Sequence, residues 1–140
     1  MVGIEFKPYE KDDVFKVKMR DGDTLGMPVG NIPGPAWTLF DNGDVVACVG
    51  LHHEVGNIAT LWAYGSDSIR GHGIGLVRFG KKWLDYAIND MKFQRIQAVV
   101  REDREEYCRF IELFGFEKEG LMRKAAANGG NIWLYSRVED

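Results

Sequence analysis

Residues 59–91 decide the fold: they read ATLWAYGSDS, then IRGHGIG, then LVRFGKKWLDYAINDM. An apolar run of strand type leads into a glycine-rich turn, and the turn continues directly into an amphipathic helix. The first turn of a helix exposes unpaired backbone N–H groups and the positive end of the helix dipole, which favour a bound phosphate. Gly71, Gly73 and Gly75 carry no side chain, so they let a ligand approach this backbone closely.

Length and composition indicate one globular domain. The chain has 140 residues, 45% of them hydrophobic, and a net charge of −3, which argues against a general nucleic-acid binder. Cys48 and Cys108 show neither metal-ligand spacing nor a disulfide framework, which is typical of a reducing compartment. We find no signal pattern and no run long enough to span a membrane. We therefore expect a cytoplasmic protein with no metal and no nucleic-acid or membrane partner.

Hydrophobic periodicity and turn signals predict the order of the elements. Asn42-Gly43 between two apolar runs is typical of a hairpin, because this turn needs positive φ. The expected strands cover residues 2–9, 36–40, 45–52, 58–64, 93–100, 116–121 and 132–138. The expected helices cover residues 11–20, the stretch after the glycine turn up to Met91, and about 103–114, where Gly115 takes the C-cap position.

The strand at 58–64, the helix after it and the strand at 93–100 form a βαβ unit. We therefore expect these two strands to be parallel and adjacent. Three antiparallel strands precede the unit, which does not suit a doubly wound nucleotide-binding sheet. Residues 21–35 contain glycines and three prolines, so we expect a loop there, either functional or a plain surface connection.

This order of elements, with the glycine turn in this place, resembles the GNAT superfamily of acyl-CoA-dependent N-acetyltransferases. The family signature is Arg or Gln, two residues, Gly, one residue, and Gly or Ala, and residues 70–75 (RGHGIG) match it in full. The resemblance extends over about residues 36–138 and includes the Gly115-Phe116 pair after the second helix. It implies an α/β (α+β) GNAT fold in a single domain, 1–140, with six to seven mostly antiparallel strands, splayed between 58–64 and 94–100, and three to four helices.

The resemblance also implies acetyl-CoA as the cofactor and direct acetyl transfer to a primary amine, either a small molecule or a peptide. In relatives the glycine turn holds the pyrophosphate, and the preceding strand offers backbone groups to the pantetheine arm. The protein is then a monomer or a homodimer. The cofactor-binding residues implied here are Ala63, Tyr64, Gly65, Arg70, Gly71, His72, Gly73, Ile74, Gly75, Leu76 and Arg104.

Two residues that the family usually has on the second helix are absent. Ile111 stands where relatives carry a Tyr that acts as general acid to the sulfur, and Arg104 stands where an Asn is expected. Tyr107 lies one helical turn before Ile111 on the same face, so it is a candidate acid, and a buried core residue is the alternative. Candidates for the general base are Glu54 and then His52, which share one face of a strand; a solvated hairpin end is the alternative.

The missing Tyr and Asn keep a second hypothesis open. The run from Cys108 to Phe116 also resembles GNAT-like proteins of tailed bacteriophages, some of which are virion-associated. This resemblance implies a non-catalytic structural or interaction protein that has kept the fold, located in the host cytoplasm or the virion.

Overall fold

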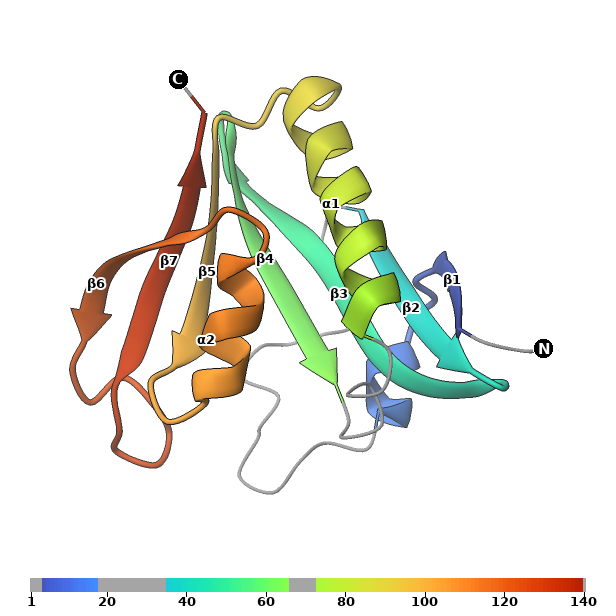
Figure 1. The fold of residues 1–140 in the computed structure, drawn as a ribbon, viewed down its shortest axis with the longest axis horizontal. Helices are drawn as coiled ribbons and strands as arrows, with labels where there is room; N and C mark the ends of the chain where they lie inside the picture. The colour runs from blue at the N-terminus through green and yellow to red at the C-terminus, as the bar shows by residue number, and fades with distance from the viewer. Residues whose placement is uncertain (1–3, 18–34, 66–72, 140) are drawn as a thin grey trace. The chain divides into compact units, whose positions relative to one another are not determined.

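The computed structural model describes residues 4–17, 35–65 and 73–139 (Figure 1). Seven strands form one sheet in the order β1-β2-β3-β4-β5-β7-β6. The chain groups into two compact units. The first unit comprises Met1–His53 and Leu61–Leu76, and the second comprises Glu54–Thr60 and Val77–Asp140.

The elements follow the predicted order closely. The strands are β1 (Ile4–Pro8), β2 (Ala36–Asp41), β3 (Asp44–Val55), β4 (Ile58–Gly65), β5 (Arg95–Arg101), β6 (Glu117–Met122) and β7 (Ile132–Val138). The helices are α1 (Gly73–Asn89), α2 (Glu105–Glu112) and a short 3₁₀ helix, η1 (Asp13–Lys16). The hairpin between β2 and β3 is confirmed, since Asn42 and Gly43 both have positive φ, 52° and 88°.

The expected number of helices is wrong for the described residues, which contain two α-helices instead of three or four. Within the described part of residues 11–20, only η1 forms. Asp12 adopts a left-handed φ of 71°, and the Asp13 carboxylate accepts a hydrogen bond from the Glu10 backbone N–H at 3.0 Å. This local bond offers the backbone an alternative to an α-helix. Residues 18–34 lie outside the described residues.

A buried carboxylate anchors η1 to β2 in the first unit. The Asp13 side chain is 3% exposed, and its Oδ2 accepts a hydrogen bond from Thr38 Oγ1 at 2.7 Å. Burial acts to raise the pKa of Asp13, but the bonds from Thr38, the Glu10 N–H and Lys16 outweigh it and hold the pKa below its usual value. The anchored segment adds to a hydrophobic core of Val14, Val17, Cys48 and Trp62.

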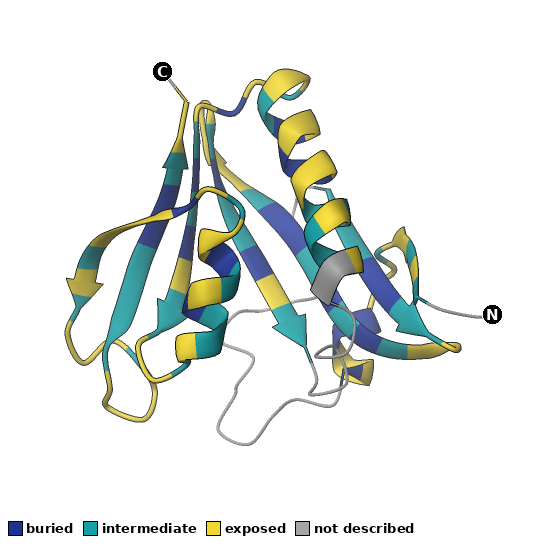
Figure 2. Cartoon of the chain, in the orientation of Figure 1, coloured by how far each residue is buried: buried dark blue, intermediate teal, exposed yellow. Residues whose placement is uncertain are grey.

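In the second unit, successive residues of β5 face opposite sides of the sheet. Buried and partly exposed positions alternate along β5 (Figure 2), and Ile96 and Ala98 are buried. Ala98 pairs with Tyr135 of β7, whose hydroxyl donates to Glu112 Oε2 of α2 at 2.7 Å. We call this side of β5 the helix face. Arg95 and Gln97 point to the other side, which we call the polar face.

The helices of the second unit pack closely on each other. A Cβ placed on Gly80 of α1 would lie 2.5 Å from Cε1 of Phe114, which follows α2. Arg137 of β7 ties this packing to the sheet, because it donates to the Phe114 carbonyl at 3.2 Å and pairs with Asp85 of α1 at 3.6 Å. Among the described residues, neither helix combines the length and apolar character needed to cross a bilayer.

Candidate functional site

The start of α1 is the predicted phosphate site. Arg70, Gly71 and His72 lie outside the described residues. The predicted helix is present, but α1 begins at Gly73, inside the motif that was expected to form the turn. Its first turn carries no acidic residue, and a Cβ placed on Gly75 would meet no atom within 4 Å. Among the described residues, an anion therefore meets no side chain above Gly75 and no carboxylate in the first turn of α1.

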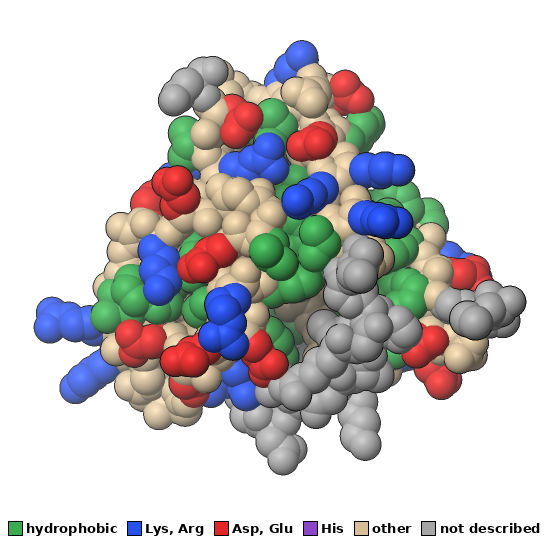
Figure 3. All heavy atoms as spheres, in the orientation of Figure 1, with side chains coloured by type: hydrophobic (Ala, Val, Ile, Leu, Met, Phe, Trp, Pro, Cys, Tyr) green, Lys and Arg blue, Asp and Glu red, His purple; other side chains and the backbone are tan. Residues whose placement is uncertain are grey.

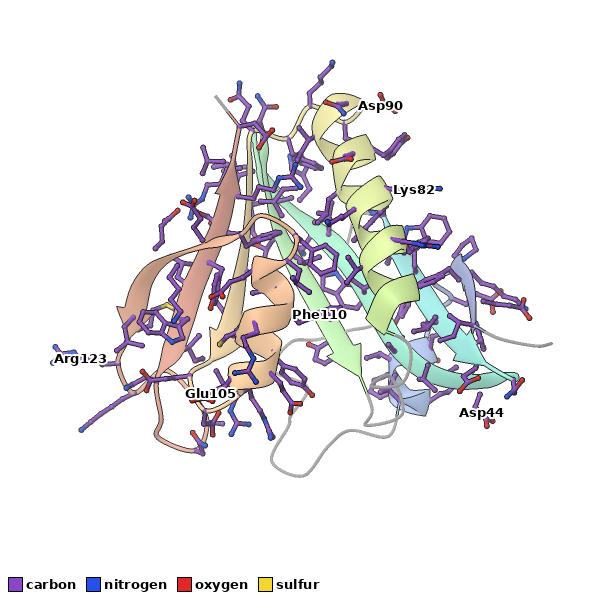
Figure 4. All side chains as sticks on the ribbon, in the orientation of Figure 1. Asp44, Lys82, Asp90, Glu105, Phe110 and Arg123 are labelled. Atoms are coloured by element: carbon purple, nitrogen blue, oxygen red, sulfur yellow. The ribbon has the colours of Figure 1, made fainter. Side chains whose placement is uncertain are left out.

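One exposed side of α1 is basic. Arg78, Lys81 and Lys82 are exposed, and Figure 3 shows Lys and Arg side chains at the surface over this helix. Lys82 extends away from the helix into solvent (Figure 4). The positive charges add to the favourable field of the helix start for an anion.

The end of β4 carries the residues expected along a pantetheine arm. Ala63 is exposed, while Tyr64 and Gly65 are half-buried, and burial raises the pKa of Tyr64. Next to them, the buried Trp62 ring lies over Gly50 of β3, where an added Cβ would come within 2.5 Å of the ring. Trp62 is therefore a core residue whose packing fixes this part of β4.

The predicted parallel arrangement of β4 and β5 is confirmed, and the pairing is short. It covers three residue pairs: Ile58↔Arg95, Ala59↔Ile96 and Thr60↔Gln97. Beyond them β4 runs on to Gly65 and β5 to Arg101. The cleft expected between strands 58–64 and 94–100 stays a prediction.

A chain of hydrogen bonds runs through the last of these pairs, Thr60 and Gln97, and ends at Glu54. Arg95 Nε donates to Gln97 Oε1 at 2.9 Å, and Gln97 Nε2 donates to Thr60 Oγ1 at 3.2 Å. Thr60 Oγ1 then donates to Glu54 Oε1 at 2.9 Å. We call these residues (Arg95, Gln97, Thr60 and Glu54) the Glu54 chain. All belong to the second unit.

The Glu119 carboxylate fixes the far end of the Glu54 chain, because it accepts two hydrogen bonds from Arg95. Arg95 donates to both oxygens of Glu119, from Nη1 at 2.6 Å and from Nη2 at 3.0 Å. Ser136 Oγ also donates to Glu119. The bonds from Arg95, and then from Ser136, lower the pKa of Glu119 to about 2. Glu119 is therefore ionised near neutral pH and holds the Arg95 guanidinium in place.

The second helix places the other candidate residues. Tyr107 is half-buried, and Ile111 is buried at the position where the resemblance implies an acid Tyr. Arg104 is the residue before α2, and its carbonyl accepts hydrogen bonds from the backbone N–H groups of Tyr107 at 3.0 Å and Cys108 at 3.1 Å. Arg104 thus starts the helix through its backbone.

The two candidates for the general base, Glu54 and His52, differ in exposure and belong to different units. Glu54 is exposed in the second unit and accepts a hydrogen bond from Thr60, whereas His52 is half-buried in the first unit.

Two features of the site were missed from the sequence. One is the Glu54 chain beyond Glu54 itself, although the alternation of residues 95–98 (RIQA) carries the signal that Arg95 and Gln97 share a face. The other is the hydroxyl of Tyr135, which reaches α2 at Glu112. Burial, followed by the bond to Glu112, raises the pKa of Tyr135.

Sequence comparison and structure comparison give different results. No protein-family model matches the chain, and no curated protein matches its sequence. Solved structures do match. A GNAT-family acetyltransferase from Streptococcus pneumoniae superposes with a TM-score of 0.75 at 14% identity, covering 98% of this chain and 99% of that chain.

Two ribosomal-protein acetyltransferases also match. One is a ribosomal-protein alanine acetyltransferase from Vibrio fischeri, with a TM-score of 0.67 and 18% identity over 76% of this chain and 62% of that chain. The other, an α-N-acetyltransferase in complex with coenzyme A, gives a TM-score of 0.66 and 17% identity over 76% of this chain and 63% of that chain. This chain therefore spans less than two thirds of the length of both proteins. The three matches show that the chain has the GNAT fold.

Proposed function

We propose that this GNAT-fold chain binds acetyl-CoA and transfers the acetyl group directly to a primary amine. The observation that carries the proposal is the start of α1, where the described residues leave open space above the exposed Gly75 and place no acidic residue in the first helical turn. One solved protein of the same fold is in complex with coenzyme A, which supports this choice of ligand.

The proposed cofactor contacts use mainly backbone groups. The N–H groups of Gly73, Ile74, Gly75 and Leu76 would hold the pyrophosphate, together with Arg70, Gly71 and His72. The backbone of Ala63, Tyr64 and Gly65 would bind the pantetheine arm, with Arg104 as a further cofactor residue. Bound acetyl-CoA supplies an acyl group activated as a thioester.

An amine must lose a proton before its nitrogen can attack, because an ammonium group has no lone pair. Glu54 is our first candidate to accept that proton, since Thr60 holds its carboxylate at the last paired residue of β4 and β5. His52 is the second candidate. As the C–N bond forms and the C–S bond breaks, the nitrogen loses a second proton and the leaving sulfur takes one up. Tyr107 is the candidate donor to the sulfur.

A non-catalytic binding protein is the second candidate function. Ile111 favours it, because a buried aliphatic side chain cannot donate a proton where relatives carry a Tyr. The two functions share cofactor binding and differ in turnover.

Calorimetric titration with acetyl-CoA, followed by an assay for thiol release with a panel of primary amines, tests both candidates. We expect binding in the micromolar range and turnover with at least one amine. Gly75→Leu should weaken binding by about tenfold or more, because its side chain fills the approach to the helix start. Gly120→Leu is the matched control, since it also adds a side chain where no atom lies within 4 Å, but on β6.

Absence of binding at high micromolar acetyl-CoA would contradict the proposed function. Binding without thiol release for any amine would favour the non-catalytic candidate.

A further inference from the structure

We infer that Thr60 and Gln97 are positioning residues that hold the Glu54 carboxylate in the orientation in which it accepts the proton of the amine. The inference rests on the proposed function, in which Glu54 is the proton acceptor. It assigns a role to a hydrogen-bonded chain that crosses from β3 through β4 to β5, within the second unit.

The chemistry of the two ends fixes the direction of every bond in the Glu54 chain. A guanidinium group only donates, so Gln97 must turn its carbonyl oxygen toward Arg95. The amide nitrogen of Gln97 is then left to donate to Thr60. An ionised carboxylate only accepts, so the Thr60 hydroxyl must give its proton to Glu54. Each group in the chain therefore has one orientation that satisfies both neighbours.

The start of the chain is rigid. Arg95 makes two hydrogen bonds to Glu119, which also accepts one from Ser136. Gln97 lies between the buried residues Ile96 and Ala98, and its backbone pairs with β4 on one side and β7 on the other. The amide of Gln97 is therefore presented to Thr60 from a fixed position.

The other end of the chain is the Glu54 carboxylate. Glu54 is exposed and lies near the end of β3, just before the turn at Gly56 and Asn57. An exposed Glu side chain samples several rotamers unless a contact selects one. The Thr60 hydroxyl selects one of them through Oε1, and hydrogen bonds in a chain strengthen one another. Without Thr60 or Gln97, the carboxylate spends less time in that orientation.

Steady-state kinetics of the full chain test this role. Thr60→Val keeps the shape of the side chain and removes its hydroxyl, and Gln97→Met removes both amide bonds. We expect each to lower kcat/KM about tenfold, as for loss of one hydrogen bond to a charged group. The affinity for acetyl-CoA should stay unchanged. Thr60→Ser should restore activity to within about twofold, because it retains the donor.

Two comparisons separate positioning from a general structural effect. Gln94→Met is the matched control for Gln97→Met, since Gln94 is exposed just before β5; it should leave kcat/KM unchanged. In a Glu54→Gln background, Thr60→Val should cause no further loss, because the group that it positions is gone. A further tenfold loss in that background would overturn the inference.

A readout that needs no turnover completes the test. The ¹³C chemical shift of the Glu54 carboxyl carbon should move in Thr60→Val and Gln97→Met, and stay in place in Gln94→Met. If the wild type turns over amines but Thr60→Val is fully active, or the carboxyl signal does not move, the inference alone fails. If the wild type turns over no amine, the proposed function fails, and the positioning role fails with it.

Discussion

Neighbouring residues of β5 lie in two different environments, on opposite faces of the sheet. On the helix face, Ile96 and Ala98 are almost fully buried and pack under the helices of the second unit. On the polar face, Arg95 and Gln97 make directed hydrogen bonds to side chains from β4 and β6. Because successive side chains of a strand point to opposite faces, one face of β5 packs in the core and the other carries hydrogen-bonded polar side chains. Substitutions on the two faces should therefore change different measurements.

The largest effect on stability is expected on the helix face. Ile96 is 1% exposed, so Ile96→Ala removes buried methyl groups and leaves a cavity. We expect a loss of about 3 kcal/mol in the free energy of unfolding, measured by urea denaturation. Gln97→Met on the polar face should change that free energy by less than about 1 kcal/mol. Equal losses in the two variants would refute the separation of the faces.

A smaller effect is expected for the hydroxyl of Tyr135. Tyr135→Phe removes the bond to Glu112 and should lower the free energy of unfolding by about 1 kcal/mol at neutral pH. Folding raises the pKa of this phenol above its ordinary value of about 10, so its contribution is full below pH 10 and falls as the pH rises further. The wild type should therefore lose stability above pH 10 more steeply than Tyr135→Phe.

Denaturation curves between pH 7 and pH 11 give this comparison. Tyr86→Phe is the control, because Tyr86 is 53% exposed on α1. A Tyr86→Phe variant that changed the pH dependence as much as Tyr135→Phe does would assign the effect to tyrosines in general.

A third prediction concerns Gly80 of α1, where the helices of the second unit pack against each other. Gly80→Ala gains helix propensity of about 1 kcal/mol but drives a methyl group into the Phe114 ring. We expect overpacking to win and the variant to lose about 1 kcal/mol of unfolding free energy, with unchanged affinity for acetyl-CoA. A more stable Gly80→Ala would mean that Phe114 moves aside at little cost. Thermal unfolding and calorimetric titration measure the two quantities.

The smallest effect on stability should have the opposite sign. Gly75→Ala lies on the same helix but adds its methyl group to open space, so it should stabilise the fold by about 0.5 kcal/mol. Its affinity for acetyl-CoA should fall severalfold, since the methyl group stands where the pyrophosphate would approach. If binding is unchanged in Gly75→Ala, the phosphate site does not include this part of α1.

Most of the elements were predictable because their signals are local. The Asn42-Gly43 hairpin and the apolar stripe of α1 each lie within a short stretch of sequence, and the structure places them as predicted. The helix at 11–20 was overestimated, because Asp12 and Asp13 form a local turn that apolar spacing does not reveal. In that segment Val14 and Val17 are buried, whereas Phe15 of η1 is 61% exposed.

The candidate site was less predictable, because its contacts join residues far apart in the chain. Gln97 meets Thr60 across 37 positions, and Tyr135 meets Glu112 across 23. Alternation along β5 predicts that Arg95 and Gln97 share a face, but strand order decides which side chains they meet. The insertion of β7 between β5 and β6 has no local signal.

The two cysteines give the chain a pair of internal reporters. Cys48 is fully buried in the first unit, where burial raises the pKa of its thiol to about 11, and Cys108 is buried in the second unit. A buried thiol reacts with alkylating reagents only when its surroundings open. The labelling rates of the two thiols therefore measure the opening of each unit separately in the unmodified protein. Equal rates would show that the units open together as one cooperative domain, and unequal rates would show that one opens while the other stays closed.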